Sequence, residues 1–365
     1  MENIINKFKF KNEGRIFYLD QLRALAIIGV IGIHISAAYL VKFDPNSFNW
    51  IISGFFAFFT RFAVPIFLML SGALLLNKEY KILEFIKKRY PRIIIPFLFW
   101  GVIYVIFAIL FQNKASYFSS LSTAIPFIVK MFLGVQGYLT HFWYVWLILS
   151  VYLLFPIINK WIKNSSFSEI KYFLGIWFIT SIFVSFNIPY YNINLSYFAG
   201  PIGFVILGYY LSNKTNKILG NIFLWPILFL ISTLLRVWTL FDLSISANHL
   251  VMASDIYSAL SVIQATSMFL MIKNFNDNQI FTKAASILKN GIIGNLTVSL
   301  SRYSYGIYLI HVLFLKFFII FGLSFANKSA IKWIPFLVIV ILLLSWGTLA
   351  ILNRIPLINK ITGMH

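Results

Sequence analysis

The sequence LRALAIIGVIGIHISAAYL, residues Leu22 to Leu40, is apolar over the length of a membrane span but contains Arg23 and His34. A transmembrane helix needs about 20 such residues. The two side chains are 11 positions apart, which is three helical turns plus about 20°, so a helix places them on one face. Along the axis they are ~16 Å apart, about half of the hydrocarbon thickness. Because a guanidinium in lipid is costly, this face is expected to meet a partner or a water-filled cavity, and its residues are candidates for function.

The composition indicates the class of protein. Of the 365 residues, 60% are hydrophobic and 11% are charged, whereas soluble domains carry about 25% charged residues. The mean hydropathy is +0.85. We therefore predict an all-α, polytopic membrane protein with a single integral-membrane domain over residues 1–365. The chain has no cysteine, which excludes disulfides and cysteine nucleophiles.

Hydropathy predicts about ten transmembrane helices with short loops. The predicted spans are 17–40, 51–76, 93–112, 142–158, 172–188, 199–212, 222–241, 254–272, 305–326 and 333–352. A further segment, 119–138, contains Pro126, Lys130 and Gln136. It is predicted to be an interfacial or re-entrant helix on the outer side. If it spans the membrane instead, every later loop changes sides.

The basic residues test this topology. With the N-terminus inside, 21 of the 30 Lys and Arg residues fall in inside segments and five fall outside. The remaining four lie within spans: Arg23, Arg61, Arg236 and Lys316. Because Lys and Arg accumulate in cytoplasmic loops, this split predicts that both termini are cytoplasmic. It also explains the net charge of +20 better than binding of nucleic acid does. The cytoplasmic segments include the N-terminus, 1–16, and an amphipathic connection, 273–304.

Further polar residues lie at membrane depth. Asp20 precedes Arg23 by three positions, within reach of a local ion pair on a helix. Arg61 lies near the middle of the second predicted span. Because a charged side chain at this depth is energetically costly, we expect an anion or a carbonyl cluster near it. His141 opens the fourth span and His311 lies in the ninth. For each histidine, a role in the helix core and a role in a site both stay open.

Three smaller features complete the candidates. Arg236 and Lys316 either snorkel to the interface or line the same cavity as Arg61. Ser71 and Gly72, at the inner end of the second span, favour close approach of another helix. The histidines lie on different spans without the local spacing of metal ligands, so no metal is predicted.

The segment Asn77 to Pro96, NKEYKILEFIKKRYPRIIIP, places Lys88, Arg89 and Arg92 at the inner end of the third span. Arg89 and Arg92 are neighbours if this segment is helical. Two guanidiniums grip phosphate oxygens bidentately. Two interpretations stay open: a topology signal that contacts anionic lipid headgroups, or a site for a phosphate-bearing cytosolic ligand.

Five segments resemble one known family in their order along the chain: Leu19–His34, Val64–Leu76, Arg89–Pro96, His141–Ile158 and Ser301–His311. They resemble the acyltransferase 3 family of membrane-bound acyltransferases, including its arginine–ten residues–histidine signature and its Arg-x-x-Arg pair. Arg61 with Val64-Pro65, and the block that begins at His141, look most like the branch of O-acetyltransferases that modify surface polysaccharides and enterobacterial common antigen.

This resemblance implies transfer of an acyl group, usually acetyl, from cytosolic acyl-coenzyme A to a sugar hydroxyl of a lipid-linked or exported glycan. It also implies a multi-pass protein of the bacterial plasma (inner) membrane. A sugar hydroxyl needs a base, and His34 is the expected one. Arg23 or Arg61 is expected to stabilise the oxyanion of the tetrahedral intermediate, or Arg23 to bind the donor. The expected donor site is Arg89, Arg92 and Lys88, and His311, His141 and Asp20 are secondary candidates.

Rival functions stay open at this stage. A glycan exporter has the same gross features of many spans and buried cations, but it does not turn over acetyl-coenzyme A. A membrane sensing or anchoring module is a third reading. The bilayer, the acyl donor and the glycan are the expected partners, nucleic acid is not, and no motif predicts an oligomeric state.

Overall fold

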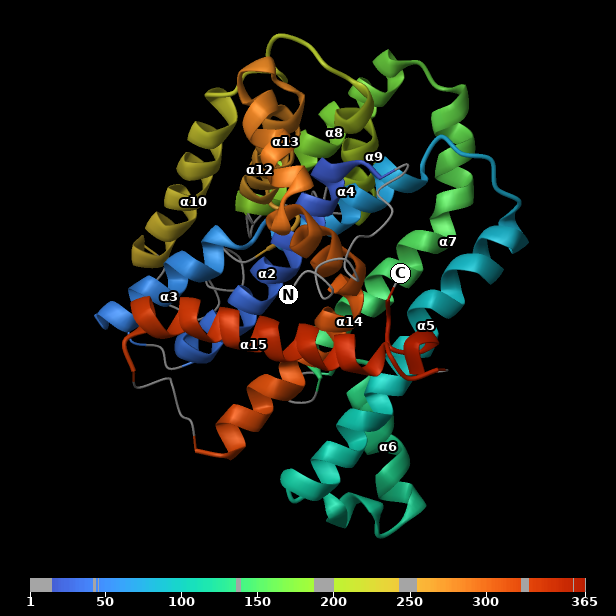
Figure 1. The fold of residues 1–365 in the computed structure, drawn as a ribbon, viewed down its shortest axis with the longest axis vertical. Coiled ribbons are helices and arrows are strands. Elements are labelled where there is room, and N and C mark those ends of the chain that lie inside the picture. The colour runs from blue at the N-terminus through green and yellow to red at the C-terminus, as the bar shows by residue number, and fades with distance from the viewer. Residues whose placement is uncertain are drawn as a thin grey trace. The chain divides into compact units, whose positions relative to one another are not determined.

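The computed structural model describes residues 15–41, 44, 46–135, 139–186, 200–242, 255–322, 328–356 and 358–364, with the backbone alone at 184–186 and 240–242. Every regular element in these ranges is an α-helix or a short 3-10 helix (Figure 1). The predicted all-α class is therefore confirmed. Residues 1–14 of the predicted N-terminal segment 1–16 lie outside the described residues. Gln136 also lies outside them.

Six helical segments in the described residues are long and apolar enough to cross a membrane, so the chain is a polytopic membrane protein. They are α2 (Phe17–Leu40), the pair α3 (Phe48–Phe59) and α4 (Ala63–Leu75), α5 (Ile82–Phe111), α7 (Trp143–Asn164) with the turn η2 (Thr140–Phe142), α14 (Ile292–Ile320), and α15 (Ala330–Leu352). The other four predicted spans coincide with α8 (Phe167–Phe186), α9 (Pro201–Asn213), α10 (Leu224–Asp242) and α12 (Ala259–Asp277). The count of ten spans and the cytoplasmic termini stay predictions.

The chain divides into two compact units, which are described separately. Unit 1 takes the described residues within Met1–Leu76, Asn164–Arg302 and Ala330–Ile334. Unit 2 takes those within Asn77–Lys163, Tyr303–Ser329 and Pro335–His365. The single integral-membrane domain over residues 1–365 stays a prediction.

In unit 1, the backbones of helices α4 and α9 pack directly against each other at two glycines. A Cβ atom on Gly72 of α4 would lie 1.8 Å from the carbonyl oxygen of Val205, and one on Gly208 of α9 would lie 2.0 Å from that of Met69. Only glycine allows helices to pack this closely, as small residues do in membrane proteins generally. The role expected for Gly72 is confirmed.

Replacing Gly72 with alanine is expected to lower the stability of the purified protein by about 3 kcal/mol, because the methyl group meets backbone that has no rotamer to change. The measurement is thermal denaturation in detergent. Gly175→Ala on α8 is the matched control, since its Cβ would meet nothing within 4 Å. If both variants melt at the wild-type temperature, the close contact between α4 and α9 is not present in the protein.

The second predicted span is broken between α3 and α4, at Thr60–Phe62. Pro65 has no N–H to bond the carbonyl of Arg61, and its ring would clash with that carbonyl in a continuous helix. The Thr60 hydroxyl donates to the Phe56 carbonyl oxygen at 2.7 Å. Gln264 of α12 donates from Nε2 to the Phe58 carbonyl oxygen at 2.8 Å. Two carbonyls at the end of α3 therefore have side-chain donors beside the break, as irregular backbone at membrane depth requires.

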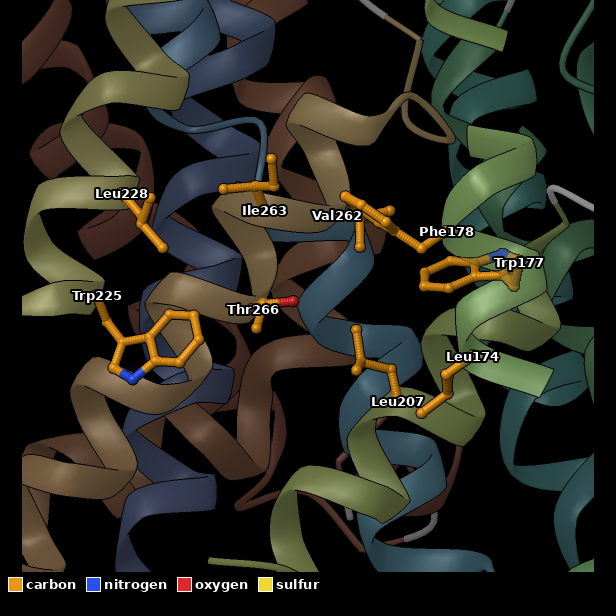
Figure 2. Close-up of a pocket in the computed structure, with 9 residues that line it drawn as sticks. All are labelled: Leu174, Trp177, Phe178, Leu207, Trp225, Leu228, Val262, Ile263 and Thr266. Carbon is orange, nitrogen blue, oxygen red and sulfur yellow. The ribbon is translucent and has the colours of Figure 1, made fainter. Parts of the chain in front are cut away.

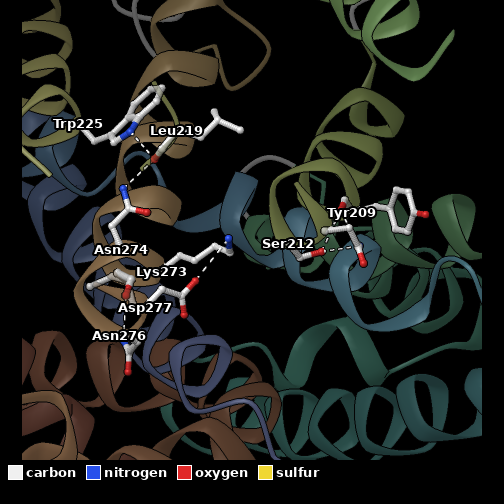
Figure 3. A network of polar contacts seen from close by, with 10 residues as sticks. Tyr209, Ser212, Leu219, Trp225, Lys273, Asn274, Asn276 and Asp277 are labelled. Carbon is white, nitrogen blue, oxygen red and sulfur yellow. Dashed lines mark hydrogen bonds and ion pairs between the residues drawn. The ribbon is translucent and has the colours of Figure 1, made fainter. Parts of the chain in front are cut away.

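A polar network ties the C-terminal end of α12 to the turn before α10 (Figure 3). The carbonyl oxygen of Leu219 accepts from Asn274 Nδ2 at 2.8 Å and from Trp225 Nε1 at 3.0 Å. Lys273 Nζ pairs with Asp277 at 3.4 Å and is almost fully buried.

The predicted connection 273–304 is largely helical, because α12 reaches Asp277, α13 covers Thr282–Asn290 and α14 begins at Ile292. Its cytoplasmic location stays a prediction.

In unit 2, α5 starts 11 residues before the span predicted at 93–112. Two hydroxyls fix this helix: Tyr90 donates to the Leu149 carbonyl oxygen of α7, and Tyr305 of α14 donates to that of Ile93, both at 2.8 Å. The short helices η1 (Ala115–Phe118) and α6 (Leu121–Phe132) follow, and η5 (Ile358–Lys360) lies near the C-terminus. With 12 residues, α6 is about 18 Å long and too short to span the membrane.

Candidate functional site

The first polar cluster of unit 1 contains Arg15, Asp20, Arg23 and Ser301 and is called the Arg23 network. Arg15 holds the Asp20 carboxylate with two nitrogens, Nη2 at 2.6 Å and Nε at 2.9 Å. The Ser301 hydroxyl of α14 donates to Asp20 Oδ1 at 2.6 Å, and Arg23 Nη1 donates to Ser301 Oγ at 3.5 Å. The expected ion pair between Asp20 and Arg23 is therefore corrected: Arg15 is the paired cation, and Arg23 reaches Asp20 through Ser301.

This network is largely shielded from water. Asp20 is 5% exposed. Its side-chain hydrogen bond with Arg15 raises the pKa of Arg15 above its usual value. Two arginines and one serine thus surround one carboxylate. The arrangement anchors the start of α2 to α14 and fixes the face on which His34 lies three turns later.

The second cluster of unit 1 surrounds the break in the second span and is called the Arg61 cluster. It comprises His34, Arg61, Arg236, Asp255, Ser258 and Ser261. The charge of Arg61 acts on His34, and Arg61, Arg236 and Asp255 act electrostatically on one another. Arg236 is 1% exposed and donates from Nη2 to the Ser258 hydroxyl at 2.7 Å and to that of Ser261. The catalytic candidate on α2, whose side chain is partly buried, therefore lies within electrostatic range of Arg61 at the break between α3 and α4.

Unit 2 contains a cluster of buried aromatic and imidazole rings around His141 and His311. The two ring centroids are 5.7 Å apart, and both side chains are buried. Tyr104 packs against His141 at 5.6 Å and donates its hydroxyl to the Leu309 carbonyl oxygen at 3.0 Å. The Tyr308 hydroxyl donates to the His141 carbonyl oxygen. The structure thus brings together two histidines that are 170 residues apart in the sequence.

The hydrogen bonds of His311 fix its neutral tautomer. Nδ1 lies 2.7 Å from the carbonyl oxygen of Tyr308 and 3.2 Å from that of Ile307. Because a carbonyl oxygen only accepts, Nδ1 carries the proton, and the neutral ring presents a lone pair at Nε2. His311 therefore stays a secondary candidate for the base.

The basic residues of the third predicted span lie on the first turns of α5. Arg89 and Arg92 are three positions apart on this helix and therefore neighbours, as expected. Lys88 and Arg92 are exposed, whereas Arg89 is half-buried. The adjacent turn is fixed by the Lys163–Glu79 ion pair at 2.7 Å, which lowers the pKa of Glu79. Two neighbouring guanidiniums on a helix suit a phosphate.

The candidate residues thus fall in two units. Asp20, Arg23, His34 and Arg61 belong to unit 1, whereas Lys88, Arg89, Arg92, His141 and His311 belong to unit 2. Arg236 belongs to the Arg61 cluster. This agrees with the second of its two expected roles, which was to line the same cavity as Arg61. Lys316 belongs to unit 2, where the charge that acts on it is Lys114.

Unit 1 also has an apolar cavity of about 240 Å³ between α8, α9, α10 and α12 (Figure 2). Trp177, Trp225, Val262 and Thr266 are among its lining residues, and none of the lining residues is charged. This cavity offers no group for acid–base chemistry. Across the described residues, no group of three or more His, Asp or Glu side chains could hold a metal ion.

The comparison with protein families identifies one family. A model of the acyltransferase 3 family, described as an acyltransferase domain, matches residues 16–351. The chain belongs to the acyltransferase 3 family. No curated protein and no solved structure gives a significant match. The resemblance expected from the five segments is confirmed at this level, and the protein is an acyltransferase of the membrane.

Sequence reasoning missed several residues of this acyltransferase. Ser301 lies within a motif that the sequence singled out, but only the structure gives it a role between Asp20 and Arg23. Asp255 had one available signal, since it is one of only ten acidic residues and lies at the start of the span predicted at 254–272. The sequence indicated Arg15 only as one of the basic residues that precede the first predicted span, 17–40, and predict its orientation.

Proposed function

We propose that this acyltransferase moves an acetyl group from cytosolic acetyl-coenzyme A to a hydroxyl of a cell-surface or lipid-linked glycan in a bacterial plasma membrane. The observation that supports the proposal is that the charge of Arg61 acts on His34 in a member of this family. An imidazole near a guanidinium is suited to deprotonating a hydroxyl and stabilising the oxyanion that forms.

The order of events follows from these groups. His34 takes the proton of the acceptor hydroxyl while its oxygen attacks the thioester carbonyl. The tetrahedral intermediate collapses, breaks the C–S bond and releases the coenzyme A thiolate, which takes up the proton held by the His34 imidazolium and leaves His34 neutral again. Direct transfer of this kind needs no acyl-enzyme.

The helix geometry favours different roles for Arg23 and Arg61. Arg23 lies ~16 Å from His34 along α2, beyond the reach of one side chain, whereas an oxyanion donor must lie about 3 Å from the reacting oxygen. If His34 is the base, Arg61 is the better cation for the oxyanion. Arg23 then contributes to donor binding or to the position of α2.

The proposed activity is tested by measuring coenzyme A release from acetyl-coenzyme A by the purified protein, with and without crude cell-envelope glycan. Release that depends on the glycan is the expected result. A folded protein that neither binds acetyl-coenzyme A nor releases coenzyme A with any glycan fraction would instead favour an exporter.

The donor site is tested by Arg89→Gln combined with Arg92→Gln. Losing two charge-assisted contacts to phosphate is expected to raise the KM for acetyl-coenzyme A by about tenfold or more, with little change in the KM for the acceptor. Steady-state kinetics with each substrate varied in turn makes the measurement. Lys81→Gln, at an exposed position just before α5, is the control. An unchanged KM for the donor would remove this assignment and leave the lipid-headgroup role.

A further inference from the structure

Gln264 of α12 is a fully buried amide beside the break in the second predicted span. Its Nε2 donates to the Phe58 carbonyl oxygen at 2.8 Å and to the Thr233 hydroxyl at 2.9 Å. The Thr233 hydroxyl gives its own hydrogen to the Phe229 carbonyl oxygen at 2.9 Å. Both hydrogens of the Gln264 amide are therefore used. Because a carbonyl oxygen only accepts, these bonds also fix which end of the amide is the nitrogen.

The oxygen of this amide is the atom that these contacts leave open. Gln264 Oε1 is buried and has no hydrogen-bond partner among the described residues. Since Nε2 faces Phe58 and Thr233, Oε1 points away from both of them. A buried acceptor without a donor costs free energy, and the amide cannot turn to relieve this cost without breaking its two hydrogen bonds. Gln264 thus holds a fixed acceptor for a group that donates a hydrogen bond.

This acceptor lies in the region of the expected chemistry. The Phe58 carbonyl oxygen, which accepts from Gln264, also accepts from the backbone N–H of Arg61 at 3.2 Å. The charge of Arg61 in turn acts on His34. Arg61 and His34 are partly exposed, whereas Gln264 is fully buried. A molecule that reaches Arg61 from the surface of unit 1 therefore has Gln264 on the buried side of the same break.

The chemistry of the open atom limits what it binds. An amide oxygen only accepts, so its partner must carry a hydrogen, and an ionised carboxylate or phosphate is excluded. A sugar offers several hydroxyls. The hydroxyl that is acylated gives its single hydrogen to His34 and has none left for Gln264, so a different hydroxyl of the sugar must be the donor.

We propose that Gln264 Oε1 accepts a hydrogen bond from a second hydroxyl of the acceptor sugar, beside the hydroxyl that is acylated. The contact orients the sugar so that one hydroxyl meets His34. It also makes the enzyme selective, because a sugar without the second hydroxyl leaves this buried oxygen without a donor. Arg61 keeps its proposed role toward the oxyanion. The inference rests on the proposed function for the sugar acceptor and for His34 as the base.

The test compares Gln264→Met with wild type, because methionine keeps the length of the side chain but has no amide oxygen. The kcat/KM for crude cell-envelope glycan in coenzyme A release is expected to fall by about tenfold, the loss of one neutral hydrogen bond. The KM for acetyl-coenzyme A is expected to stay unchanged. Glycan binding is measured separately, without acetyl-coenzyme A, from the saturable shift in melting temperature of the full-length protein in detergent. The glycan affinity is expected to fall by a similar factor.

Two variants separate this contact from support of the break. Thr233→Val removes a partner of the amide nitrogen and leaves Oε1 in place, so its glycan affinity is expected to stay within about threefold of wild type. Gln264→Glu loses the hydrogen bond to the Phe58 carbonyl but keeps an acceptor oxygen, so it is expected to bind the glycan more tightly than Gln264→Met does. If Gln264 only supported the break, Gln264→Glu would bind no better than Gln264→Met, because a carboxylate repels the Phe58 carbonyl oxygen.

Two outcomes would overturn the inference: wild-type glycan affinity and kcat/KM in Gln264→Met, or equal losses of affinity in Gln264→Glu and Gln264→Met. If Gln264→Met does not fold, Gln264→Glu decides, and a loss of glycan affinity of about tenfold in that variant overturns the inference. If glycan binding requires Gln264 but coenzyme A is never released, the glycan contact stands and the proposed function fails. If Gln264→Met releases coenzyme A as wild type does, the proposed function stands and the inference fails.

Discussion

Replacing His34 with alanine is expected to reduce glycan-dependent coenzyme A release by about 10²–10⁴-fold, the usual contribution of a positioned general base. The KM for acetyl-coenzyme A is expected to change little, because His34 acts on the acceptor hydroxyl. The protein is expected to stay folded, since the His34 side chain is only partly buried on α2. The measurement is steady-state coenzyme A release by purified variants of equal thermal stability.

His311→Ala is the matched comparison, because His311 is a buried imidazole of unit 2 whose Nδ1 hydrogen bonds define its tautomer. A large loss of rate in His311→Ala with near wild-type activity in His34→Ala would move the base to unit 2. Incubation with radiolabelled acetyl-coenzyme A and no acceptor tests the direct route. A stable label on the wild-type protein would mean that transfer passes through an acyl-enzyme.

Replacing Asp20 with asparagine is expected to destabilise the protein by about 3 kcal/mol or more, the usual cost of removing one partner of a buried ion pair. Asp20 is the shared acceptor of the Arg23 network, bonded to Arg15 and Ser301. The asparagine keeps the shape of the side chain but removes the charge that balances Arg15. Thermal denaturation in detergent provides the measurement.

Two further variants grade this effect. Ser301→Ala is expected to cost about 1–2 kcal/mol, since it removes a neutral hydroxyl that bridges Arg23 and Asp20. Arg15→Gln is expected to cost less than Asp20→Asn, because the Arg15 side chain is 26% exposed and that of Asp20 is 6% exposed. Equal effects of all three would show that the carboxylate is not the centre of the network.

The positions of the helices could be predicted from the sequence because apolar length is a strong signal in a membrane protein. The structure places a helix at each predicted span, from α2 at Phe17–Leu40 to α15 at Ala330–Leu352. The break at Thr60–Phe62 could not be predicted from hydropathy, since both sides of it are apolar. Pro65 was visible, but whether its break is tolerated depends on Gln264, about 200 residues later.

The candidate site was predictable one residue at a time but not as an arrangement. Arg23, His34 and Arg61 stand out because charge at membrane depth is rare. Their partners do not stand out, since Ser301 and Ser258 are ordinary residues until the fold brings them to a guanidinium. Asp20 pairs with Arg15 and not with Arg23 because of the backbone conformation just before α2. Helical spacing alone favours the pair of Asp20 and Arg23, which is wrong.

The Arg23 network also has a consequence for biogenesis. Arg15 and Asp20 are only five positions apart, so their pair can form as soon as the first helix leaves the ribosome. Ser301 is synthesised 278 residues after Arg23, which at ~5–20 residues per second is a delay of about 15–60 s. During that interval the first helix resides in the insertion machinery or the bilayer without its final contact. Completion of the network therefore marks a late step in assembly, and truncated chains that end before α14 are expected to be recognised and degraded.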